Sequence, residues 1–97
     1  MSEHSLRKKT LDAAAQAVLQ DRAAAYGTVE NNFQNIANLW SVYLNTDVTP
    51  SDVASMMTLL KVARLMNNPS HFDSWVDIAG YAACGGEVSH VGKANRK

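Results

Sequence analysis

Two aspartates stand four residues apart in the stretch FDSWVD, a spacing that brings side chains together on a helix. Positions i and i+4 share one helical face, so Asp73 and Asp77 are expected to point the same way. Carboxylate oxygens suit Mg²⁺, which often binds through one or two carboxylates together with substrate phosphates. With Glu30 as a further carboxylate, one hypothesis is a Mg²⁺ site of Glu30, Asp73 and Asp77, in which Asp77 and Glu30 are the catalytic residues that orient a water.

Two basic residues accompany these acids. At about 100° per residue, Arg64 falls within the apolar stripe of a helix over residues 50–66, and Lys61 lies at the edge of that stripe. An unpaired buried charge costs a great deal of free energy, so Arg64 must be paired or must reach solvent. We refer to five charged residues together as the polar seam: Glu30, Lys61, Arg64, Asp73 and Asp77.

The polar seam has two interpretations. In the structural one, Asp73 or Asp77 neutralises Arg64, and the charges only fix the register of the helices. In the functional one, the carboxylates hold Mg²⁺, while Lys61 and Arg64 bind a phosphate chain and neutralise its charge in the transition state. Arg22 and Tyr26, which precede Gly27, are candidates to close one end of the seam.

Four helices are predicted to position these residues. The first covers about residues 5–25 and the second about residues 29–44, with Gly27 between them. The third covers about residues 50–66, and its start is marked by the capping sequence TPSD. Ser70 can cap the fourth helix, which two glycines, Gly85 and Gly86, are expected to stop.

Apolar spacing predicts the core-facing side of each helix. For the second helix the predicted stripe is Phe33, Ile36, Ala37, Trp40, Tyr43 and Leu44. For the third helix it is Val53, Met56, Met57, Leu60 and Ala63. For the fourth helix it is Phe72, Trp75, Val76, Ala79, Ala82 and Ala83. Short connections favour antiparallel neighbours, so we predict an all-α fold, a compact four-helix bundle-like domain.

Length and composition narrow the class of protein. The 97 residues are expected to form one domain, with an ordered core over about residues 6–88, basic flexible ends and help from homo-oligomerisation. The net charge of +0 argues against a nucleic-acid binder. A single cysteine, no apolar leader and no apolar run of about 20 residues predict a cytoplasmic protein that does not enter a membrane.

The other candidate ligands and nucleophiles are better explained by structural roles. The histidines His4, His71 and His90 lack zinc-ligand spacing with Cys84, and we expect His71 at a helix N-terminus. Cys84 has no obvious activating base, so we expect this thiol to pack between helices.

Three stretches in order carry a resemblance: RAAAYGTVENNFQNIANLW, VTPSDVASMMTLLKVARL and FDSWVDIAGYAACGG. Over residues 20–88 the chain resembles a small family of phage- and prophage-encoded all-α domains of unknown function. More distantly it is similar to the MazG-type NTP pyrophosphohydrolases, in which acidic residues on facing helices bind Mg²⁺. That resemblance implies metal binding by Glu30, Asp73 and Asp77, with Lys61 facing the phosphates. The acidic motif is incomplete, because ENNF stands where that superfamily carries E-x-x-E, and DSWVD where it carries E-x-x-D.

Two functions are therefore predicted. The first is a phage-type accessory protein with a MazG-like helical fold that binds a nucleotide and hydrolyses it with Mg²⁺. The alternative is a non-enzymatic helical module that interacts with a host or phage protein complex, with its affinity in exposed apolar residues of the second and third helices. In the phage case the protein would act in the cytoplasm of the host cell.

Overall fold

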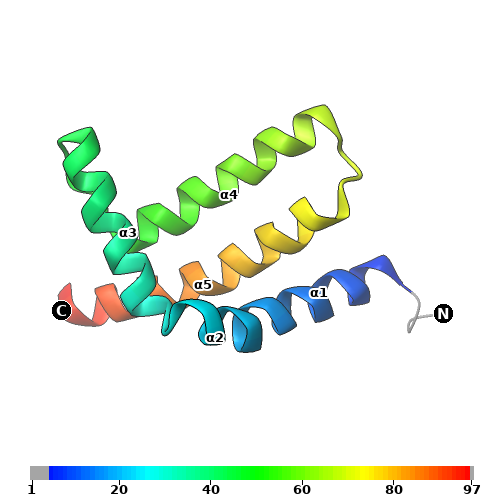
Figure 1. Cartoon of the computed structure of the whole chain (residues 1–97), viewed down its shortest axis with the longest axis horizontal. Helices are drawn as coiled ribbons and strands as arrows, with labels where there is room; N and C mark the ends of the chain where they lie inside the picture. Colours follow the sequence, from blue (N-terminus) through cyan, green and yellow to red (C-terminus); the bar gives the residue numbers. More distant parts are fainter. Residues whose placement is uncertain (1–4, 97) are drawn as a thin grey trace.

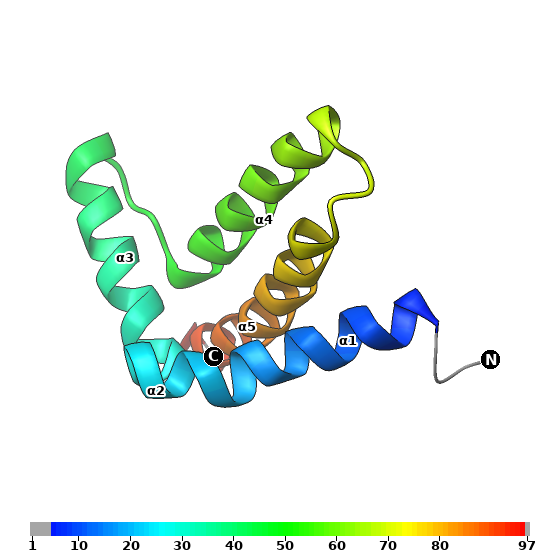
Figure 2. The same cartoon turned by 45° about the vertical axis from the view of Figure 1, so that its right-hand side comes forward.

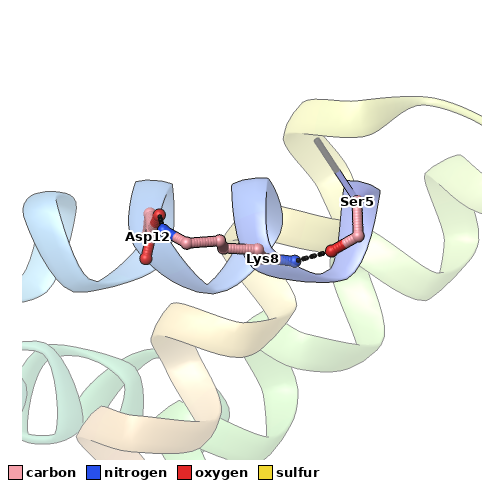
Figure 3. A network of polar contacts seen from close by, with 3 residues as sticks. All are labelled: Ser5, Lys8 and Asp12. Carbon is pink, nitrogen blue, oxygen red and sulfur yellow. Dashed lines mark hydrogen bonds and ion pairs between the residues drawn. The ribbon is translucent and has the colours of Figure 1, made fainter. Parts of the chain in front are cut away.

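The first helix begins where the sequence supplies a capping side chain. The computed structural model describes the backbone of residues 5–96 and the side chains of residues 5–22 and 24–90. Ser5 Oγ accepts a hydrogen bond from the backbone N–H of Lys8, which satisfies one free donor at the start of α1 (Leu6–Gln16). Lys8 Nζ and Asp12 Oδ2 form an exposed ion pair of 2.6 Å one turn further on (Figure 3). Because both side chains are hydrated, this pair adds little stability.

The first helical segment contains a wider turn. After α1 the chain continues through the π-helical stretch η2 (Ala17–Asp21) into α2 (Arg22–Tyr26), and the N–H of Arg22 donates to Ala17 O, five residues back. Because the turn is wider, residues spaced four apart stay on the same side of the helix. On that side Ala14 is buried, and Val18 and Arg22 are half-buried. Gly27, with a φ of 79°, then adopts a left-handed conformation that glycine tolerates and ends the segment.

The next two helices start at the predicted caps. Thr28 Oγ1 accepts from the N–H of Asn31 at the start of α3 (Val29–Leu44). Thr49 and Asp52 form a reciprocal capping box at the start of α4 (Pro50–Asn67), with Pro50 in the first helical position. These boundaries agree with the predicted helices over residues 29–44 and 50–66.

The last helix, α5 (Phe72–Arg96), continues through the two glycines that were expected to stop it, so that prediction was wrong. The physical reason is close packing. A Cβ added at Gly85 would lie 3.1 Å from the Cβ of Ala54 on α4, and one added at Gly80 would lie 3.1 Å from Val18 Cγ1. The start of α5 also differs, because His71 Nδ1, and not Ser70, accepts from the backbone N–H of Ser74.

The helices stack with α5 in the middle. In Figure 1, α4 lies above α5 and α1 lies below it, while α3 crosses one end of the stack. The view in Figure 2 agrees, and there α3 and α4 diverge from the end where they meet. Within residues 5–96 the chain forms four helical segments and no strand, which confirms the predicted all-α, bundle-like fold. No helix in this range is long and apolar enough to cross a membrane.

The core lies where α3, α4 and α5 meet, around one large aromatic side chain and several small or medium ones: Phe33, Ala37, Val53, Ala54, Cys84 and Val88. The predicted stripes were correct for Phe33 and Val53 but wrong for several large residues. Tyr43 is 88% exposed, and Leu60 and Trp75 are about half exposed. For Tyr43 and Leu60 the reason is that α3 and α4 are apolar on more than one side, so that spacing alone does not select the buried one.

Replacing Gly86 by alanine tests the continuity of α5. An added Cβ meets nothing within 4 Å, and Gly86 is not among the glycines with positive φ, so Gly86→Ala should stabilise the fold by about 0.5–1 kcal/mol through helix propensity. Urea unfolding followed by circular dichroism measures this gain. Gly85→Ala is the control and should gain less, because its Cβ presses on Ala54. A loss of stability in Gly86→Ala would show that the helix ends at this point.

Candidate functional site

An ion pair between α4 and α5 lies at the centre of the polar seam. Lys61 Nζ lies 2.9 Å from Asp77 Oδ2, and the Lys61 side chain is only 11% exposed. The Asp77 side chain is 41% exposed and therefore remains in contact with solvent. A nearly buried ammonium requires a counter-charge, and Asp77 supplies it. Acidic and basic side chains of these two helices thus do converge, as the sequence suggested.

The cation in the core is Lys61 and not Arg64, which corrects the prediction that Arg64 sits in the apolar stripe. The buried side of α4 follows the spacing Val53, Met57, Lys61 and Leu65, four residues apart throughout. Arg64 is exposed and borders a shallow hollow of about 300 Å³ beyond the end of the bundle. Asp77 therefore neutralises Lys61, and not Arg64 as the structural interpretation had it.

The two other acidic residues of the seam, Asp73 and Glu30, are not grouped with Asp77 in a way that would bind a metal ion. Asp73 is exposed in the first turn of α5, and Glu30 is half-buried in the first turn of α3, where a negative charge favours the helix dipole. Across the part of the chain that the structure describes, no three His, Cys, Asp or Glu side chains are grouped so as to hold a metal ion. Glu30, Asp73 and Asp77 thus do not form a three-ligand site in this arrangement.

A second cation organises the corner between α2 and α3. The Arg22 guanidinium donates from Nη2 to Asn32 Oδ1, and its Cζ lies 5.2 Å from the ring centroid of Tyr26 and 4.9 Å from that of Phe33. Both distances suit cation–π attraction. The motif of an arginine, Tyr-Gly and Asn-Phe is therefore a set of residues in mutual contact. The contacts of Arg22 with Asn32 and Phe33 were not predicted, although the order of the residues in the motif contained the signal.

A small cavity lies between this corner and α5. It has a volume of about 80 Å³ and is lined by eight residues, including Arg22, Asp77, Tyr81 and Cys84. The Nε of Arg22 is buried without a hydrogen-bond partner among the described residues. Pockets that enclose drug-sized ligands measure about 300–1,000 Å³, so a whole nucleotide does not fit here without movement of the helices.

Cys84 lies on the wall of this cavity and within the core cluster. Burial raises the pKa of its thiol, while the nearby Arg22 charge lowers it to a smaller extent. The thiol thus stays protonated near neutral pH, and a protonated thiol is a poor nucleophile. This agrees with the packing role predicted from the sequence.

A larger hollow of about 450 Å³ opens between α4 and α5 on the side that bears Ser55, Leu59 and Gly86. We call it the α4–α5 groove. All of its lining residues are uncharged, so it offers no cation to a phosphate group.

A double-mutant cycle tests the ion pair. Asp77→Asn leaves the Lys61 ammonium buried without its counter-charge, so we expect a loss of about 1–3 kcal/mol in urea unfolding. Lys61→Met removes the buried charge itself and should cost about 1 kcal/mol or less. The double variant should behave like Lys61→Met alone, because Asp77 then has nothing to neutralise. Additive losses would contradict the pairing.

Comparison with known proteins places the chain in a family. Residues 9–89 match the model of DUF6378, a domain of unknown function. The Gene 55 protein of Mycobacterium phage L5 is 48% identical over 73 residues, which are 74% of this chain and 47% of that protein. The Gene 55 protein of Mycobacterium phage D29 is 38% identical over 79 residues, which are 81% of this chain and 52% of that protein.

The chain spans about half the length of these two curated relatives. No solved structure matches it. The family match covers the helices from α1 to most of α5, including the Lys61–Asp77 pair and the Arg22 corner. The chain is therefore a phage protein of helical fold that belongs to the DUF6378 family, a domain family of unknown function.

Proposed function

We propose that this chain is a non-enzymatic helical module that binds another phage or host protein through exposed apolar residues. The observation that carries the proposal is the distribution of large apolar side chains. Among the described residues, fifteen of them are exposed, whereas only five buried core residues are larger than alanine or cysteine. Nine of the fifteen exposed ones lie on α3 and α4. Concentrated exposed apolar surface is typical of proteins that bind other proteins.

The proposed binding surface is on the second half of α3. Three large apolar residues lie on the side of this helix that faces away from the buried Phe33 and Ala37: Leu39, Val42 and Tyr43. We call these three residues the α3 tip. They are 69%, 81% and 88% exposed, and this half of α3 stands away from α5 in both views of the molecule (Figures 1 and 2).

The charges around the α3 tip define the kind of partner. Residues 23–60 contain no Lys, Arg or His, and their three charged residues are the acids Glu30, Asp47 and Asp52. An apolar patch in an acidic region is complementary to an apolar patch bordered by lysine or arginine. The same charge repels phosphate groups, so a protein partner suits this surface better than a nucleic acid.

Val42→Lys tests this surface. Val42 is 81% exposed, so the fold should tolerate lysine while the affinity for a partner falls about 30-fold or more. The tagged chain is expressed during phage infection, and each retained protein is identified, produced alone and titrated by calorimetry. Gln34→Lys, an exposed position on the same helix, is the matched control and should bind like the wild type. Equal binding by both variants, or no protein that binds the purified wild-type chain, would overturn the proposal.

Nucleotide binding with Mg²⁺, the MazG-like alternative, is the second candidate function. It is supported by the convergence of Lys61 and Asp77 beside a cavity that Arg22 also lines. In this scheme a phosphate takes the place of Asp77 next to Lys61, and Mg²⁺ binds the released carboxylate. Two observations argue against nucleotide binding. The cavity is so small that the helices would have to separate to admit a triphosphate, and Arg64 is exposed and does not line the cavity.

A thermal-shift series separates the two functions. The Tm is measured with no addition, with Mg²⁺ alone, and with Mg²⁺ plus each NTP or dNTP. A ligand at about 100 times its Kd stabilises the folded state by about 2.7 kcal/mol, which is a shift of many degrees for a domain of this size. Our proposal predicts no rise in Tm in any of these samples. A rise with nucleotide that is absent in Asp77→Asn would establish the second function instead.

A further inference from the structure

Helix α4 has two apolar sides, and only one of them faces the core. Its inner side packs on α5 through Val53, Ala54 and Leu65. The opposite side carries a second series at helical spacing, which we call the outer stripe: Met56, Leu59, Leu60, Ala63 and Met66. At about 100° per residue these five positions fall within a third of the helix circumference. All five are exposed, with Leu59 at 64% and Met66 at 84%.

A helix that is apolar on all sides is normally buried on all sides. Here α4 is an outer helix of the stack, with α5 on one side and α3 across its start (Figure 1). The outer stripe thus faces away from every helix that the structure describes. This arrangement is stable in water when another surface covers the stripe.

We infer that the cover is a second copy of the chain, whose α4 packs antiparallel on this α4 around a two-fold axis. The inference goes beyond the proposed function, because it uses α4 and leaves the α3 tip free for a different protein. Three properties of α4 support a second copy as the occupant: the area that is exposed, the placement of charges and the shape beside the stripe.

The exposed area of the outer stripe is apolar and large for a single helix. Its leucine and methionine side chains are 39%, 64%, 50% and 84% exposed at Met56, Leu59, Leu60 and Met66. The outer stripe has the composition of a permanent homodimer interface, since it contains only leucine, methionine and alanine.

The charges on α4 favour an antiparallel copy. The helix has one acidic residue, Asp52 near its start, and one exposed basic residue, Arg64 near its end. Antiparallel pairing brings the Asp52 end of each chain to the Arg64 end of the other, whereas parallel pairing brings like charges together. An axis at the level of residue 58 sets Asp52 level with Arg64 and Met56 level with Leu60. The same patch then serves on both chains, as two-fold symmetry demands.

The surface beside the stripe is hollow. The α4–α5 groove borders the outer stripe at Leu59 and is lined by small uncharged residues such as Ser55 and Gly86. In a two-fold pair each chain presents both protruding side chains and a groove, so leucine or methionine of one copy can enter the groove of the other.

The full 97-residue chain is tested by light scattering coupled to size exclusion and by sedimentation velocity. We expect a mass of about 21 kDa, twice the 10.6 kDa of the chain, at roughly 100 µM, with dissociation on dilution. Leu59→Lys places a charge within the stripe and should raise the dimer dissociation constant about 30-fold or more. Leu39→Lys, the same change on α3 at a similar exposure, is the matched control and should leave the dimer intact.

Crosslinking tests orientation without a disruptive charge. In a Cys84→Ser background, chains with Met56→Cys are mixed with chains with Leu60→Cys and oxidised. Antiparallel pairing at the expected register predicts mixed 56–60 disulfides in excess, whereas parallel pairing predicts disulfides between identical positions. The inference is overturned if the wild type is monomeric throughout, if folded Leu59→Lys dimerises like Leu39→Lys, or if identical positions crosslink preferentially. Circular dichroism confirms that each variant is folded.

Discussion

Helix α4 is apolar on two sides, and the described part of the chain covers only one of them. The inner side joins α5 so closely that a Cβ added at Gly85 would lie 3.1 Å from the Cβ of Ala54. The outer side presents leucine and methionine to solvent. In soluble proteins, the free energy of exposing such a surface is recovered through association, so the architecture of the single chain already points to an assembly. The α3 tip is a second exposed apolar surface. It lies on the second half of α3, whereas the buried core residues of this helix, Phe33 and Ala37, lie before it.

Two cations stabilise this arrangement from inside. Lys61 spans the contact between α4 and α5 and ends at Asp77, and Arg22 closes the corner before α3 between two aromatic rings and Asn32. Each cation is partly or largely withdrawn from water and is matched by a specific partner, which fixes how the helices meet. The small cavity between them is a consequence of the packing around Gly80, Cys84 and the π-helical turn. Both interior cations thus contribute to fixing the helix packing, and the function that we propose uses the exposed surface instead.

The helices were predictable because their signals are local. Thr28, Thr49 and Pro50 mark starts through hydrogen bonds within three residues, so no knowledge of the tertiary structure was needed. The continuation of α5 past Gly85 was not predictable. The reason for a glycine at this position is its close contact with Ala54, which is more than thirty positions away in sequence. The choice between Lys61 and Arg64 failed for a related reason. Helix periodicity identifies apolar sides, but when a helix has two, only the packing of the neighbours decides which one is the core.

The candidate site was predictable in part. Asp77 and Lys61 lie together in the polar seam, as predicted, but their direct ion pair was not predicted, because the structural interpretation assigned the buried cation to Arg64. Asp73 is exposed in the first turn of α5, and Glu30 lies in the first turn of a different helix, α3, so helix spacing alone did not show which acid would meet Lys61. The contacts of Arg22 with Asn32 and Phe33 were not predicted, because they cross the turn at Gly27 to a different helix.

The central claim is that the outer side of α4 is covered in the assembled protein, and the native methionines can report on it. Met56 and Met66 lie on this side, whereas Met57 faces the core of the single chain. Peroxide converts accessible methionines to sulfoxides, and peptide mass spectrometry follows each position. The account predicts that Met56 and Met66 are oxidised slowly in concentrated protein and faster as it is diluted, with Met57 slow throughout. Rapid oxidation of Met66 at every concentration, at the rate of a peptide in solution, would contradict it.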